Sequence, residues 1–201
     1  MAEKHSFARV AGAGITFQAG SAALDSATIF SALVYQLTGS PIAVGATTAI
    51  LRFGWLFPQL IVGYLAQQGR SGRTSMYYYV IGAFGRAVCM ALLALVLWLG
   101  ADWGHTTLAV AVLVLWTAYA FISGIVAVPY NDTVARRVPS DQRSRLLATR
   151  FFGGGILALA VAAIADNLAG GMAFPLSYAA IITMAWRCRF MSFRPPPPAL
   201  N

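Results

Sequence analysis

Three ionisable side chains lie inside otherwise apolar stretches of the sequence: Asp25, Arg52 and Arg86. A charge at the centre of a bilayer costs about 2.5 to 3.5 kcal/mol on insertion scales, so intramembrane charges are rare and usually line pathways for ions or solutes. A carboxylate and a guanidinium at the same depth can neutralise each other through a bidentate contact. The chemistry predicted for these residues is therefore ion pairing, anion binding or proton coupling within a membrane.

The three charges are expected at similar depths. We count from the cytoplasmic end of each predicted helix with a rise of about 1.5 Å per residue, which places Asp25 roughly 18 Å deep, Arg52 roughly 21 Å and Arg86 roughly 15 Å. After Asp25 pairs with one arginine, the other must face water, an anionic ligand or an acidic residue from elsewhere in the assembly. The alternative is a packing clamp between Asp25 and one arginine, with no ligand.

Polar and aromatic side chains accompany these charges at helical spacing. Gln18, Ser21 and Asp25 are three and four residues apart, so they share one face of a helix. Arg52 and Trp55 share a face of the next helix in the same way, and a tryptophan can hold a cation or stack on a ligand. The candidates for substrate binding or ion coupling are Asp25, Arg52, Arg86, Gln18 and Trp55.

The elements that must position these residues are apolar helices. Of the 201 residues, 59% are hydrophobic and only 10% are charged, and a membrane-spanning helix needs about 20 apolar residues. We predict an all-α polytopic membrane protein in which six transmembrane helices form one bundle, residues 13–186. The predicted spans are 13–37, 42–66, 76–99, 107–130, 148–168 and 172–186. Residues 1–12 form an N-terminal arm, and residues 187–201 form a basic, proline-rich tail.

Basic residues are segregated among the loops. Lysine and arginine occur in the arm, in the connections after the second and fourth spans and in the tail, whereas the other connections have none. Such residues are held on the cytoplasmic side. Both termini are therefore predicted to be cytoplasmic, in a multi-pass protein of the cell membrane, which is the inner membrane if the source is bacterial. The net charge of +8 does not favour nucleic acid as a partner, because the basic residues are not gathered on one surface beside aromatics.

Metal and enzyme chemistry find little support in the sequence. Cys89 and Cys188 are the two cysteines, and there is no CxxC motif or histidine cluster, so we predict no metal, cofactor or catalytic residue. A lipid-modifying enzyme would need a catalytic cluster at the membrane surface. Asp132 and Asp141 with the arginines near them are the only candidates, and we interpret residues 131–147 as a cytoplasmic connection.

Residues 8–186 resemble the N-terminal half of a major facilitator superfamily (MFS) transporter. The resemblance rests on the six spans, the basic connections and the stretch GYLAQQGRSGR after the second span. The family signature there is Gly-x-Leu-Ala-Asp-Arg followed by glycine and basic residues; Gln67 replaces its acidic residue. In the family this motif forms a cytoplasmic latch, so the resemblance implies that Arg70 or Arg73 binds Asp132. The implied latch residues are Gly63, Arg70, Arg73 and Asp132.

The resemblance also implies a function. MFS proteins carry out secondary active transport by alternating access, in which two bundles rock around a central site. We therefore expect transport of a small solute across the lipid bilayer, together with a second six-helix half or another copy of the chain, and we expect this chain to be a half transporter or a truncated one. The arginine excess favours an anionic or zwitterionic solute, and Asp25 is a candidate for proton coupling. The alternatives are a membrane scaffold without transport activity and a lipid-modifying enzyme.

Overall fold

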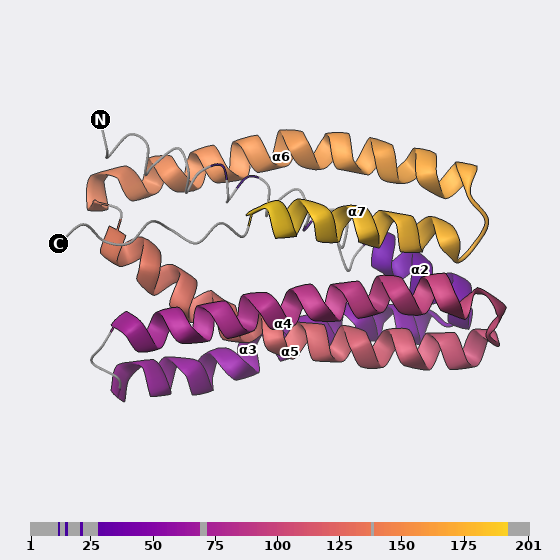
Figure 1. The fold of residues 1–201 in the computed structure, drawn as a ribbon, viewed down its shortest axis with the longest axis horizontal. Helices are drawn as coiled ribbons and strands as arrows, with labels where there is room; N and C mark the ends of the chain where they lie inside the picture. The colour runs from indigo at the N-terminus through magenta and orange to yellow at the C-terminus, as the bar shows by residue number, and fades with distance from the viewer. Residues whose placement is uncertain are drawn as a thin grey trace.

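The described part of the chain is helical. The computed structural model describes residues 12, 15, 21, 28–68, 72–137 and 139–192, and no strand occurs among them. Long helices lie side by side along one direction (Figure 1). In chain order they are α2 (Ile29–Thr38), α3 (Pro41–Gln68), α4 (Gly72–Leu99), the 3₁₀ turn η1 (Gly100–Asp102), α5 (His105–Arg137), α6 (Ser140–Gly171) and α7 (Leu176–Ser192). The prediction of an all-α fold is confirmed for these residues.

Four of the helices are long and apolar enough to cross a membrane. They contain the candidate spans Pro41–Leu65, Tyr77–Asp102, His105–Asp132 and Ser140–Leu168, which correspond to the second to fifth predicted spans. Much of the predicted first span, residues 13–37, lies outside the described residues. Helix α2 corresponds to the last part of this span. Helix α7, with 17 residues, is short for a span. Six spans and the orientation of the termini therefore stay predictions.

Residues 131–147, predicted as a connection between two spans, are helical over most of their length, so a loop conformation for them is wrong. Helix α5 continues to Arg137 and α6 begins at Ser140, so only residues 138–139 separate them. The segment is polar, but arginine, glutamine, leucine and alanine are good helix formers. Pro139 separates the two helices, since a proline in a helix interior disrupts it. Pro129 lies inside α5, and the last turns of α5 bend away from α4 towards the start of α6 (Figure 1).

Helices α3, α4 and α5 pack closely because glycines remove side chains at the contacts. A Cβ built on Gly124 of α5 would lie 2.6 Å from the carbonyl oxygen of Trp55 in α3 and 3.0 Å from Cδ of Pro58. A Cβ built on Gly82 of α4 would lie 2.5 Å from Val126 of α5. Small residues allow this close approach of backbones in membranes. Helix α3 runs through Pro58 without interruption, and α5 covers the position.

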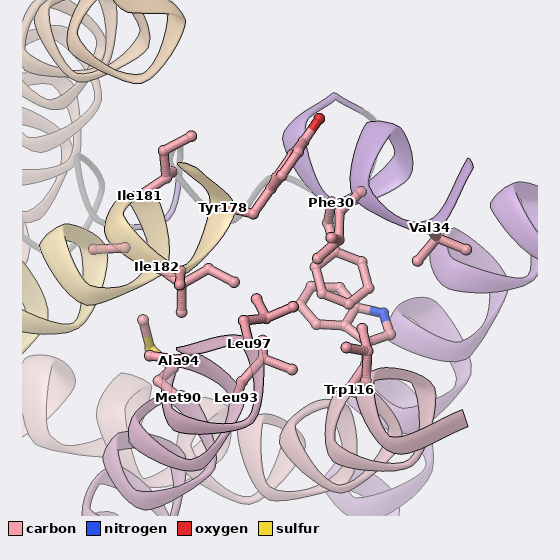
Figure 2. Close-up of a cluster of buried hydrophobic side chains, with 14 of the residues drawn as sticks. Phe30, Val34, Met90, Leu93, Ala94, Leu97, Trp116, Tyr178, Ile181 and Ile182 are labelled. Carbon is pink, nitrogen blue, oxygen red and sulfur yellow. The ribbon is translucent and has the colours of Figure 1, made fainter. Parts of the chain in front are cut away.

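The hydrophobic core lies where α2, α4, α5 and α7 meet. Figure 2 shows Phe30 of α2 over Trp116 of α5, with Leu97 of α4 and Ile182 of α7 directed into the same space. Helix α7 lies between α4 and α6, so α6 is farther from the core (Figure 1). Only 11% of an apolar 18-residue stretch of α6 is buried.

Candidate functional site

Arg52 lies on an exposed face of α3. The neighbouring apolar side chains Phe53 and Leu56 are 63% and 56% exposed, and Arg52 itself is exposed. Its guanidinium has no hydrogen bond or ion pair with any described residue. The predicted partner Asp25 lies outside the described residues, as does Gln18, so the pairing of Asp25 with Arg52 stays a prediction.

The side chains that follow Arg52 along α3 differ in burial. Trp55 is 45% exposed, and Gln59 one turn further on is half-buried. The Nε2 atom of Gln59 is buried and has no hydrogen-bond partner among the described residues, and the same holds for Oγ of Ser123 on α5. Buried polar atoms are usually satisfied, so these two atoms are places where a ligand or water could bind.

A second set of aromatic residues lies beside Arg52 on α3 and α5. The rings of Phe53 and Phe57 are stacked with centroids 5.7 Å apart, and each meets Phe121 of α5 edge-on at 6.3 Å. The sequence analysis singled out Trp55 and missed this contact. Phenylalanines four residues apart on a helix were the available signal.

Arg86 belongs to a polar cluster whose other members were not predicted from the sequence. Tyr79 precedes Arg86 by seven residues on α4, so the two lie on one face of the helix. The Tyr79 hydroxyl interacts electrostatically with Arg86, with Tyr130 of α5 and with Arg150 of α6. All four side chains are half-buried. We call Tyr79, Arg86, Tyr130 and Arg150 the arginine–tyrosine cluster.

The contact between α5 and α6 in this cluster is well defined. Nη1 of Arg150 donates a hydrogen bond of 3.1 Å to the hydroxyl of Tyr130. Cζ of Arg150 also lies 5.1 Å from the centre of the Tyr130 ring and 5.7 Å from that of Phe151, distances typical of cation–π contacts. Arg150 is not among the site residues predicted from the sequence.

The proposed latch is only partly described. Gly63 lies in α3, and a Cβ added to it would meet nothing within 4 Å. Arg73 falls within α4, but its side chain and the whole of Arg70 lie outside the described residues. Asp132 is half-buried near the end of α5. A contact between Asp132 and either arginine therefore stays a prediction.

A metal centre is not formed by the described residues, which contain no group of three or more histidine, cysteine or acidic side chains able to hold an ion. Cys89 is a buried free thiol. No protein-family model, curated protein or solved structure matches the chain.

Proposed function

We propose that this chain is a membrane transport protein, or one half of a transporter, which moves a small solute by alternating access. The observation that carries the proposal is the exposed guanidinium of Arg52 on an apolar helix long enough to cross a membrane. A charge facing lipid at that depth would be strongly unfavourable. A water-filled pathway or a protein interface removes that cost.

Other polar groups within the spans support the same proposal. Arg86 is a second intramembrane guanidinium, and buried atoms of Gln59 and Ser123 lack hydrogen-bond partners among the described residues. In our proposal Arg52, Trp55 and Arg86 face the solute pathway together with Asp25 and Gln18. The basic ends of the helices face the cytoplasm, as in an MFS half.

A membrane scaffold without transport activity is the second candidate. It is favoured by the sparse packing of α6, because only 11% of an apolar 18-residue stretch of this helix is buried. A helix with so few neighbours in its own chain has most of its surface available for another membrane protein. Scaffolding needs no solute pathway, so flux measurements distinguish the two candidates.

The test is solute flux in liposomes. The chain is reconstituted alone with an internal pH-sensitive dye, and external carboxylates, amino acids and phosphate are supplied as separate solutes. We expect flux with at least one solute, and a loss of about tenfold or more in Arg52→Gln, since a contact with a charged group is worth about 1.5 kcal/mol or more. Asp25→Asn is expected to abolish any accompanying proton movement.

The control is Arg187→Gln, which removes an exposed positive charge from α7 and is expected to leave flux unchanged. Protein content and orientation in the liposomes are measured for every variant. Unaltered flux in Arg52→Gln would remove that residue from the mechanism. If no solute gives flux, the scaffold proposal is preferred.

A further inference from the structure

We propose that the solute bound beside Arg52 is an aromatic carboxylate, whose charged group is held by Arg52 and Gln59 and whose ring stacks on Trp55. The class of solute named in this way rests on the proposed transport function and deepens it. It follows from hydrogen-bond donors inside a membrane span that have no acceptor among the described residues.

Three side chains of α3 offer donors without acceptors. The guanidinium of Arg52 and the indole N–H of Trp55 make no hydrogen bond with any described residue. Nε2 of Gln59 is buried and also lacks a partner in the described part of the chain. All three residues lie inside the span Pro41–Leu65, where lipid cannot accept a hydrogen bond. Together they predict an occupant that accepts several hydrogen bonds.

These donors share one side of α3. Trp55 is three residues after Arg52, and Gln59 is seven residues after it. Residues at these spacings lie on one face of a helix, within two turns of each other. One small solute can therefore reach all three side chains.

Helix α5 supplies a fourth donor at the same level. Gly124 packs on this stretch of α3, because a Cβ built on it would lie 2.6 Å from the carbonyl oxygen of Trp55 and 3.0 Å from Cδ of Pro58. Ser123 precedes Gly124 and is 8% exposed. Its Oγ has no hydrogen-bond partner among the described residues. A hydroxyl can donate to the same acceptor directly or through a water.

A carboxylate matches this set of donors. An ionised carboxylate only accepts hydrogen bonds, and its two oxygens suit the planar fork of a guanidinium. Helix α3 contains no charged residue besides Arg52, so a group with one negative charge balances it. A cation would be repelled by Arg52 in a medium of low dielectric, and a neutral solute would leave the guanidinium uncompensated inside the span.

Trp55 favours an aromatic body for the solute. The side chain is 45% exposed although it lies near the middle of its span, away from the interfaces at which tryptophans are enriched. Its indole has no ring contact with any described residue, whereas Phe53 and Phe57 both contact Phe121. An aromatic ring stacked on the indole gains more than the burial of its area alone would give.

An acidic side chain of the chain itself competes for the same guanidinium if it reaches it. The predicted partner Asp25 lies outside the described residues. A carboxylate of the chain that held Arg52 permanently would prevent a solute carboxylate from binding, which the experiment detects.

The test measures binding of three small probes to the full chain in nanodiscs of phosphatidylcholine. Benzoate has both the charge and the ring, cyclohexanecarboxylate has the charge without an aromatic ring, and benzamide has the ring without the charge. Binding is followed by saturation-transfer NMR of the probes, and empty nanodiscs correct for partition into lipid. We expect benzoate to bind about fivefold more tightly than cyclohexanecarboxylate and about tenfold or more than benzamide.

Substitutions separate the two parts of the site. Arg52→Gln should weaken benzoate binding about tenfold. Trp55→Leu should weaken benzoate binding about fivefold but that of cyclohexanecarboxylate less than about twofold, because leucine keeps an apolar contact and loses the stacking. The matched control is Trp103→Leu, at a tryptophan that is 44% exposed, and it should change neither affinity. The tryptophan pair keeps the test decisive even if Arg52→Gln fails to fold.

The proposal is overturned if benzoate does not bind, if benzamide binds equally well, or if Trp55→Leu binds benzoate as Trp103→Leu does. Equal weakening of both carboxylates in Trp55→Leu would also overturn it, since the ring would then make no specific contact. Benzoate binding without flux of any carboxylate would contradict transport and leave the site standing. Flux of another solute without benzoate binding would contradict only the solute class.

Discussion

Trp116 links three helices through one buried side chain. Its ring stacks on Phe30 with centroids 3.8 Å apart and on Tyr119 at 5.3 Å. Its Nε1 atom donates a hydrogen bond of 3.0 Å to the carbonyl oxygen of Thr47 in α3. The side chain is 1% exposed, so α2, α3 and α5 share contacts that a smaller residue could not make.

Replacing Trp116 should therefore weaken the bundle. We expect Trp116→Phe to lower the free energy of unfolding by about 1 to 3 kcal/mol, because it removes the hydrogen bond and leaves a small cavity. Unfolding is measured by titration with a denaturing detergent in mixed micelles. Trp103→Phe, at a residue that is 44% exposed, serves as the control; equal losses in both variants would contradict this role for Trp116.

Individual residues were predictable where a charge stood out from apolar surroundings. That contrast identified Arg52 and Arg86 in the sequence. It did not link Arg86 to Tyr130 and Arg150, because those residues lie on other helices and no spacing along the chain connects them.

Helix positions were predictable for a simple physical reason. Long apolar runs are needed to cross a membrane, and the four long spans follow those runs closely. The segment 131–147 failed because its polarity suggested a loop, whereas its residues continue the helices. Polarity reports the distance from lipid and not the backbone conformation. Helix packing was predicted only as a general use of small residues.

Glycine contacts between helices give a prediction at this scale. Gly124→Ala should lower the free energy of unfolding by about 1 to 3 kcal/mol, since the added methyl group would meet the carbonyl oxygens of Trp55 and Gly54. Gly155→Ala is the matched control, because a Cβ at Gly155 meets nothing within 4 Å. It should be neutral or slightly stabilising, as alanine favours the helix. Similar losses in both variants would contradict the close packing of α3 on α5.

At the scale of the whole molecule, the described connections at one end have no arginine or lysine, and two helices are sparsely covered. The connections α4–α5 and α6–α7, with Asp102 and Asp166 near them, lie at one end, and the α5–α6 connection beside Arg143 and Arg145 lies at the other (Figure 1). Loop composition had predicted this segregation. Only 17% of the apolar 18-residue stretch of α3 is buried, and only 11% of the corresponding stretch of α6. Lipid can cover the apolar parts of these faces, but it cannot cover the guanidinium of Arg52 at low cost.

Thiol labelling at position 52 measures most directly whether that part of α3 faces water. Cys89 and Cys188 are first replaced by alanine, and Arg52→Cys is compared with Phe84→Cys, at an exposed position well inside α4. A water-soluble, membrane-impermeant maleimide is applied to the protein in liposomes. Our account predicts that the cysteine at position 52 reacts and that the one at position 84 does not. If both remain unlabelled under conditions in which detergent-solubilised protein reacts fully, Arg52 faces lipid and the proposed pathway does not exist.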